Sequence, residues 1–166
     1  MPNFRKINLK KWLFCAASIV LLDQITKLAI LKRFTEGERM NFTPFFDLTL
    51  AYNPGAAFSF LANAGGWQRW FFTALAIGAS IVIVYWLRKE TRTLPALALT
   101  LVLGGAIGNV IDRIWLGKVI DFLLVYWKDW YYPAFNVADS AITCGAILLI
   151  WDSFFGPKPT PEPKNV

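Results

Sequence analysis

The hydrophobic and polar positions divide the sequence into four long apolar stretches separated by polar or mixed segments. A helix rises about 1.5 Å per residue, so about 20 apolar residues cross a hydrocarbon core about 30 Å thick. Each stretch approaches or reaches that length and carries few charges, which is typical of a membrane-spanning helix. The pattern therefore predicts an all-α membrane protein in which residues 1–166 form one domain, with helices at about residues 12–31, 67–87, 94–114 and 134–155.

The segment of residues 40–62 has a period of two instead of the helical 3.6. Residues 46–51 read FDLTLA, so apolar side chains alternate with polar or small ones, and the turn sequence Asn53-Pro54-Gly55 follows. Such alternation next to a turn predicts a short antiparallel β element. Because the segment is rich in phenylalanine, we expect it to lie at the outer membrane surface, packed on the helices or dipping into the headgroup layer.

Two further segments lie outside the predicted helices. Residues 115–133 hold six Trp and Tyr side chains, an aromatic belt of the kind found at membrane interfaces. We expect this segment to be a loop that anchors the protein, with a flap over a site as the alternative. Residues 156–166 read GPKPTPEPKNV, and this proline-rich composition predicts a disordered tail.

The composition agrees with a membrane protein. The chain is 56% hydrophobic and its mean hydropathy is +0.44, above the range of soluble domains. The formal charge of +6 would suggest nucleic acid in a soluble protein. Here basic residues cluster at residues 5–11 and 88–92, and the positive-inside rule places both segments in the cytoplasm. Four spans then put both termini there, in contact with anionic headgroups and not with nucleic acid.

The first apolar stretch is predicted to be retained and not cleaved as a signal peptide. Asp23, Gln24 and Lys27 interrupt it, and no small-residue cleavage site follows. Cys15 and Cys144 each lie in an apolar helix without a CxxC partner, which favours a role as small hydrophobic residues over a disulfide or a metal site.

The polar residues of the predicted helices gather at one side of the membrane. Ionisable groups within spanning helices are costly and usually functional. In the predicted topology, the polar groups of the first, third and fourth helices all fall near the outer ends, together with the turn after the β segment. This gathering indicates a single site, formed by Asp23, Lys27, Asn53, Asn109, Asp112, Arg113, Asp121, Asn136 and Asp139.

Helical spacing suggests partners for some of these residues. Asp23 and Lys27 are four residues apart with the acid first, which favours a buried ion pair that ties the first helix to the bundle. Asp112 lies beside Arg113, and the sequence leaves open whether the two form an ion pair or position a substrate.

Asp121 and Asp139 have no dedicated cation at helical spacing. Two carboxyl groups held close cannot both ionise easily, so one can act as a base and the other as an acid. This combination can activate water to hydrolyse an amide. The sequence contains no histidine, which removes Ser-His-Asp and Cys-His arrangements and the usual His-based zinc sites. A dyad of Ser59 or Ser140 with Lys27 is less favoured, because Lys27 has an acidic neighbour one turn away.

Five blocks of the sequence resemble those of the bacterial lipoprotein signal peptidases, the type II signal peptidases. They occur in the order of that family and cover nearly the whole chain apart from the two tails. The blocks are LLDQITK (21–27), YNPGAAFS (52–59), GGAIGNVIDR (104–113), VIDF (119–122) and FNVADSAI (135–142).

This resemblance implies a four-helix aspartyl endopeptidase of the bacterial inner membrane, with a small periplasmic β-cradle. Family members remove the signal peptide of prolipoproteins by cleaving before a diacylglyceryl-modified cysteine, and globomycin-class antibiotics inhibit them. The matching motifs put the catalytic pair at Asp121 and Asp139. The family's supporting polar residues fall on Asp23, Lys27, Asn53, Asn109, Asp112, Arg113 and Asn136.

The same resemblance implies that Asn109 and Arg113 orient the substrate or the aspartates and do not react. It calls for no metal and no organic cofactor, and we expect a monomer whose partners are the lipidated substrate, membrane lipids and globomycin-class inhibitors.

Two other classes of function remain as alternatives. A small transporter or proton-relay protein also places carboxylates in the membrane, but it needs polar groups in the inner half of the bundle. Residues 73–100 offer only Ser80 and Thr100 there, besides flanking charges. The second alternative is a structural assembly factor, for which both aspartates would be dispensable.

Overall fold

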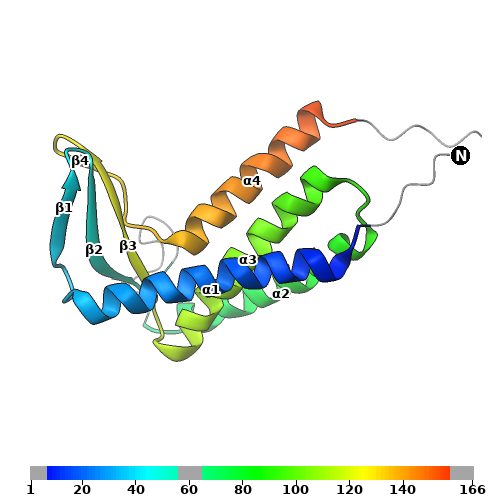
Figure 1. Ribbon diagram of the computed structural model, residues 1–166. Coiled ribbons are helices and arrows are strands. Elements are labelled where there is room, and N and C mark those ends of the chain that lie inside the picture. Colours follow the sequence, from blue (N-terminus) through cyan, green and yellow to red (C-terminus); the bar gives the residue numbers. More distant parts are fainter. Residues whose placement is uncertain (1–6, 56–64, 158–166) are drawn as a thin grey trace, which may run out of the picture.

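The computed structural model of the protein describes residues 7–55 and 65–157. Within these residues, four helices are long and apolar enough to cross a membrane, and four strands form a small antiparallel sheet. The prediction of four spanning helices with a small β element is confirmed. In chain order the elements are α1 (Leu9–Arg33), β1 (Arg39–Thr43), β2 (Phe46–Asn53), α2 (Gln68–Lys89), α3 (Thr93–Trp115), β3 (Val119–Trp127), β4 (Trp130–Tyr131) and α4 (Val137–Phe155) (Figure 1).

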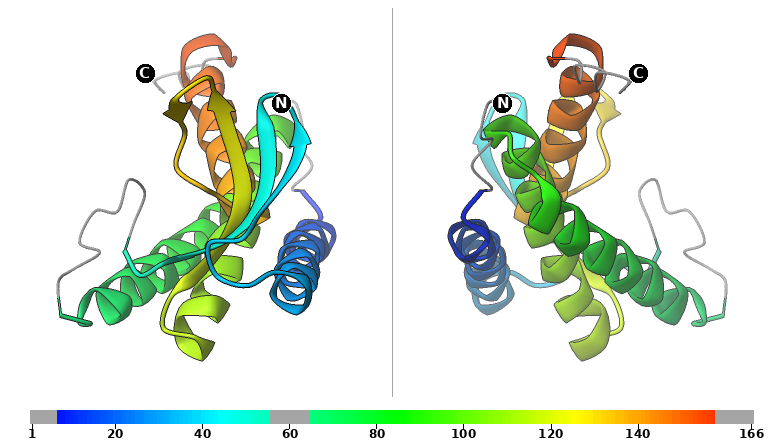
Figure 2. Two further views of the ribbon diagram at one scale, coloured as in Figure 1. Left: turned by 90° about the vertical axis from the view of Figure 1, so that its left-hand side faces the viewer. Right: turned by 90° about the vertical axis from the view of Figure 1, so that its right-hand side faces the viewer.

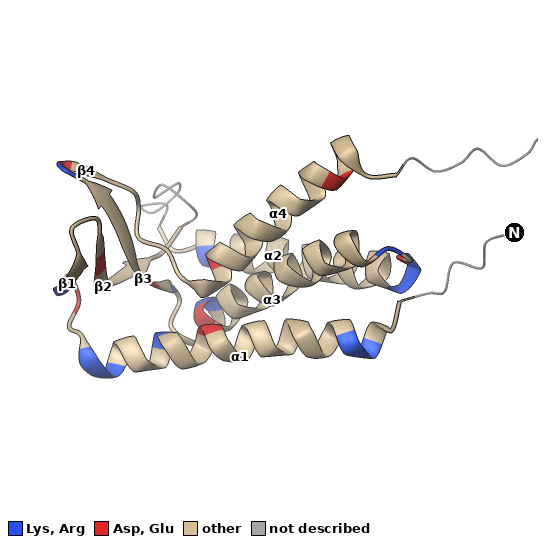
Figure 3. Cartoon of the chain, turned by 45° about the horizontal axis from the view of Figure 1, so that its top comes forward, with Lys and Arg blue, Asp and Glu red and all other residues tan. Residues whose placement is uncertain are grey.

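The sheet lies at the end of the helical bundle opposite the start of α1 and the end of α4 (Figure 1). Its strands follow the order β1-β2-β3-β4. Figure 3 shows basic residues at both ends of α1 and in the connection between α2 and α3, while acidic residues gather where α3 and α4 approach the sheet. The predicted polar site therefore lies where the bundle meets the sheet.

α3 is the central helix of the bundle. In its most apolar window 67% of the residues are buried, against 17% to 22% for the other three helices. Each of the other helices packs against α3 (Figure 2), which leaves their outer faces free for lipid. Polar side chains on α3 are therefore held inside protein and not in hydrocarbon.

Glycines on α3 allow its neighbours to approach closely. A Cβ added at Gly108 would lie 2.7 Å from Asp23 Oδ2, and one at Gly104 would lie 2.8 Å from Ile19 Cβ. At Gly105 an added Cβ would overlap the carbonyl oxygen of Ala138. Small residues of this kind let helix backbones come together in a membrane, and here they bring α1 and α4 against α3.

The prediction of a loop at residues 115–133 is wrong, because most of this segment is β3 and β4. β3 pairs with β2 along most of its length, and Asp121 lies opposite Ala51. β3 was missed because the sequence VIDFLLVYW is an almost continuous apolar run without clear alternation. Both faces of β3 are covered at its start, so residues 119–122 are all buried.

The start of α4 differs from the prediction, and parts of two predicted segments are not described by the structure. α4 was expected from residue 134 but begins at Val137, because Phe135 pairs with Leu123 across an isolated bridge and Asn136 is the N-cap. Residues 56–62 of the predicted β segment, and residues 158–166 of the predicted disordered tail, lie outside the described residues.

Candidate active site

Lys27 of α1 lies at the centre of a buried polar cluster. Its Nζ is 2.8 Å from Asp23 Oδ2 and 2.8 Å from Asp112 Oδ2, and it donates a hydrogen bond of 3.0 Å to Asn109 Oδ1. The Lys27 and Asp23 side chains are 1% and 0% exposed. One ammonium group thus serves two carboxylates, which offsets part of the large cost of burying them.

The partner of Asp112 is Lys27, and among the ion pairs of the described residues none joins Asp112 to its sequence neighbour Arg113. The alternative of an Asp112–Arg113 pair is therefore wrong. Neighbouring positions in one helix point in different directions, so Asp112 and Arg113 diverge. Which residue pairs with Asp112 depends on how α1 is rotated against α3. Arg113 instead donates to the carbonyl oxygens of Gly55, at 3.1 Å, and Asn109, at 3.3 Å.

The two carboxylates of the Lys27 cluster also hydrogen-bond the backbone of β3 and of α4. Asp23 Oδ1 accepts the backbone N–H of Ala138, in the first turn of α4, at 2.9 Å. Asp112 Oδ2 accepts the backbone N–H of Ile120, in β3, at 3.1 Å. Ala138 and Ile120 are the immediate chain neighbours of Asp139 and Asp121. The cluster therefore fixes the backbone that carries both predicted catalytic aspartates.

Gln24 is a member of this network that was not among the predicted site residues. Its Nε2 donates to Asp112 Oδ1 at 2.9 Å, to the carbonyl of Gly108 at 3.2 Å and to Asp23 Oδ2 at 3.2 Å. Its position three residues before Lys27 was the available signal, since residues at this spacing share a helix face.

Asn136 joins the two predicted catalytic carboxyl groups. Its Nδ2 donates to Asp121 Oδ1 at 2.7 Å, while its Oδ1 accepts the backbone N–H of Asp139 at 2.8 Å. Asp139 Oδ2 accepts the backbone N–H of Asn136 at 3.3 Å, so the two residues form a capping box at the start of α4. The helix cap and the link between the aspartates are the same side chain.

Asp121 and Asp139 have amide partners and no cation in direct contact among the described residues. Asn109 Nδ2 donates to Asp139 Oδ1 at 2.7 Å. Asn53 also hydrogen-bonds Asp121, and its Oδ1 accepts the N–H of Gly55 at 3.0 Å. Amide donors hold a carboxyl group in place without cancelling its charge.

The electrostatic environment of Asp121 favours its protonated form. Asp121 lies in β3, outside the spanning helices, and is 3% exposed. Burial is the main factor that raises its pKa, from an ordinary 3.8 to about 7, and the nearby charge of Asp139 raises it further, while hydrogen bonds from Asn136 and Asn53 act in the opposite direction. At neutral pH a substantial fraction of Asp121 therefore carries a proton.

Both aspartates face one cavity of about 680 Å³. β2 and β3 form one wall, α3 another, and the extended residues before α4 with the first two turns of α4 a third. In the described part of the chain, no three His, Cys, Asp or Glu side chains are grouped so that they could hold a metal ion. The residues that line the cavity include Asn53, Asn109, Arg113, Asp121, Tyr132, Phe135, Asp139, Ile142 and Cys144.

Comparison with known proteins gives one consistent result. The family model of signal peptidase II matches residues 15–155. The lipoprotein signal peptidase of Burkholderia thailandensis is 58% identical over 145 residues, 87% of each chain, and that of Burkholderia vietnamiensis is 56% identical over the same length.

The fold also resembles solved structures. Two structures of a bacterial membrane enzyme, determined by the in meso method at 2.3 Å and 1.9 Å resolution, superpose with TM-scores of 0.81 and 0.80. They are 30% and 31% identical in sequence, and the matches cover 95% and 92% of this chain and 98% of each solved chain.

Proposed function

Because this chain belongs to the signal peptidase II family, and so removes the signal peptide from prolipoproteins, we propose that it works as an aspartic endopeptidase with Asp121 and Asp139 as its catalytic pair. The observation that carries this assignment is that Asn136 hydrogen-bonds both residues beside one open cavity. Two carboxyl groups that share a site and differ in protonation can supply a base and an acid to one water-mediated reaction.

In the proposed reaction, ionised Asp139 accepts a proton from a water molecule while the water oxygen bonds to the scissile carbonyl carbon. Protonated Asp121 donates its proton to the carbonyl oxygen, which gives a tetrahedral diol. The diol then collapses: the C–N bond breaks, the leaving nitrogen takes the proton held by Asp139, and a hydroxyl proton returns to Asp121. The raised pKa of Asp121 supports its role as the initial acid.

The neighbouring polar groups have positioning roles in this proposal. Asn109 and Asn136 hold the two carboxyl groups through 2.7 Å hydrogen bonds, and Asn53 braces Asp121 from β2. Arg113 lines the cavity and is tied to the carbonyl of Gly55. Its guanidinium group is placed to bind substrate carbonyl groups beside the scissile bond.

The shape of the cavity suits a substrate that arrives from the lipid phase. Its wall continues from Asp139 along α4 to Ile142 and Cys144, and Cys144 is exposed on the membrane-facing surface of α4. Tyr132 and Phe135 cover the other rim. An acyl chain could follow this apolar wall while the peptide lies across the sheet, which supports cleavage immediately before a diacylglyceryl-modified cysteine.

The protein is a multi-span membrane protein, and we propose that it lies in the bacterial inner membrane with both termini cytoplasmic. The basic residues near the start of α1 and between α2 and α3 support this orientation. It puts the sheet and the cavity at the periplasmic surface. We also propose that the protein is a monomer. Globomycin-class inhibitors bind in the same cavity as the substrate.

The transporter alternative is not supported. In the inner half of the bundle Ser80 donates to the carbonyl of Ala76, and Thr100 to that of Ala96, each at 2.7 Å. Both hydroxyl groups are therefore satisfied within their own helices and line no polar path.

Cleavage of one prolipoprotein, with and without its diacylglyceryl group, tests substrate class and chemistry together. The purified chain is reconstituted in vesicles, and the released signal peptide is quantified by mass spectrometry. We expect cleavage of the lipidated form before the modified cysteine and at least a hundredfold less of the unlipidated form, about the loss that follows when a good contact in the transition state is removed. Equal cleavage of the two forms would contradict the proposed lipid recognition and leave the aspartic chemistry standing.

A further inference from the structure

A second large hollow lies between α1 and α2, away from the active-site cavity. It has a volume of about 1000 Å³ and shares no lining residue with that cavity. Its floor is the face of α3 that carries Leu103, Ile107 and Val110. The groove exists because α1 and α2 each pack on α3 and hardly touch each other.

We propose that this groove binds a phospholipid with a net negative headgroup, taken from the leaflet on the side of the start of α1 and the end of α2. One acyl chain fills the groove and the phosphate lies against Arg88 at its mouth. Under the orientation proposed above, that leaflet is the cytoplasmic one.

The length of the groove matches one leaflet. Along α1 it runs from Leu13 to Gln24, and along α2 from Ile77 to Arg88. Eleven helical steps correspond to about 17 Å, roughly half of a hydrocarbon core of about 30 Å. A single acyl chain fits this span, whereas a transmembrane helix needs about 20 residues.

The charge at the mouth of the groove favours an anion. Arg88 is exposed, and among the described residues it has no carboxylate in an ion pair. The acidic groups nearby are engaged elsewhere, because Arg92 pairs with Asp152 at 2.7 Å and lies 3.8 Å from Glu90. Lys89 adds a second positive charge, with its Nζ hydrogen-bonded to the hydroxyl of Tyr85. Basic sites between helices on the cytoplasmic side are typical binding sites for anionic lipids.

The walls of the groove suit an acyl chain. Ala16, Ala17 and Ser80 are small, and the hydroxyl of Ser80 is already bonded to its own helix. At the deep end, Gln24 turns its amide to Asp112 and to the carbonyl of Gly108. The groove thus presents apolar surface along its length, and the side chains of Ser80 and Gln24 already have hydrogen-bond partners within the protein.

Charge also argues against the substrate's own signal helix as the occupant. Signal peptides carry a basic segment before their apolar core, and in the proposed orientation that segment would meet Arg88 and Lys89. Like charges at a binding surface disfavour a partner. An anionic lipid headgroup is instead attracted to these two basic residues.

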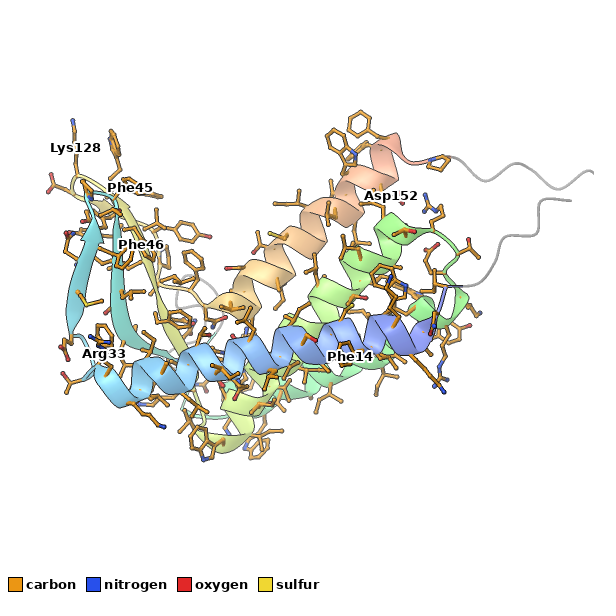
Figure 4. The ribbon with its side chains drawn as sticks, in the orientation of Figure 1. Phe14, Arg33, Phe45, Phe46, Lys128 and Asp152 are labelled. Carbon is orange, nitrogen blue, oxygen red and sulfur yellow. The ribbon has the colours of Figure 1, made fainter. Side chains whose placement is uncertain are left out.

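The test measures lipid retention by native mass spectrometry of the full chain, released from micelles that contain phosphatidylglycerol or phosphatidylcholine. We expect one phosphatidylglycerol per chain to be retained in preference to phosphatidylcholine. Arg88→Gln should weaken its binding about fivefold, the effect of one basic residue near an anionic headgroup. The matched control is Arg33→Gln, which removes the same charge at the far end of α1, where Figure 4 shows Arg33 beside the sheet. It should leave binding unchanged.

A second pair of variants tests the groove itself. Ala17→Trp fills it and should abolish retention, while Leu22→Trp, on the same helix but outside the lining, should not. Equal retention of the two lipids, or equal binding by the two arginine variants, would overturn the proposal. So would an Ala17→Trp protein that keeps its lipid but no longer cleaves prolipoprotein, because the groove would then take the substrate helix. The lipid measurements need no proteolysis, so their failure would leave the proposed function untouched.

Discussion

The Lys27 cluster and the Asp121–Asp139 pair lie side by side, and they treat buried carboxylates in opposite ways. In the Lys27 cluster, two carboxylates share an ammonium group at 2.8 Å, and all three side chains are at most 1% exposed. In the aspartate pair, two carboxyl groups are held by the amides of Asn109 and Asn136 and open onto a cavity. The carboxylates of the Lys27 cluster are neutralised by a cation and closed off from the cavity. The carboxyl groups of the aspartate pair have no cation in contact and face the cavity.

Under the proposed function, this difference separates structural carboxylates from reactive ones. In the Lys27 cluster every carboxylate has a direct ammonium partner and almost no exposed surface, which suits a structural role. Asp121 has no such cation in contact, and burial raises its pKa to about 7, where it can give and take a proton. The cluster nonetheless supports the pair, because Asp23 and Asp112 bind the backbone next to Asp139 and Asp121, respectively.

The largest expected effect comes from removing the two carboxyl groups that we propose as the catalytic pair. Asp121→Asn and Asp139→Asn should each lower the cleavage rate of a lipidated prolipoprotein by at least about 10³, because each removes an acid or base from the reaction. Both variants should still unfold cooperatively at a temperature close to that of the wild type, since asparagine keeps the shape. Single-turnover cleavage and thermal unfolding in detergent measure the two effects. Substantial activity in either variant would end the assignment of the pair.

The next largest effect is on the free energy of unfolding and comes from the Lys27 cluster. Lys27→Met leaves two buried carboxylates without their cation and should lower the free energy of unfolding by about 3–5 kcal/mol. Lys32→Met, on the exposed end of the same helix, is the matched control and should change it by less than about 0.5 kcal/mol. Equal unfolding temperatures for the two variants would show that Lys27 does not hold the bundle together.

A third expected effect is a dependence of stability on pH. In the folded protein Asp121 has a pKa of about 7, against an ordinary value of 3.8, so between these values the folded state keeps a proton that the unfolded chain has released. Its contribution to stability is therefore complete below pH 3.8 and is lost as the pH rises through about 7. Asp121→Asn should flatten this decline in unfolding temperatures measured across that window.

The cleavage rate of the wild type should fall on the alkaline side as Asp121 loses its proton, with an apparent pKa that belongs to the pair. A rate that stays constant from pH 6 to pH 9 would contradict the role of Asp121 as the acid.

The sequence predicts the helices well because each one is a long apolar run. It predicts less of the sheet, since β3 lacks the alternation that marks a half-exposed strand. For the site, spacing identifies the polar residues but not their partners. The contact of Lys27 with Asp112 depends on the rotation of two helices about their axes, which no pattern within one helix contains. Asn136 is intermediate: its capping box with Asp139 can be read from the sequence, whereas its bond to Asp121 requires the sheet to be in place.

Under the proposed function, the double role of Asn136 makes enzyme activity depend on completed assembly. Fraying of the first turn of α4 would release Asp139 from its cap and Asp121 from its amide partner in the same event. Under the proposed function, the two carboxyl groups take up their working arrangement only when the last helix has docked.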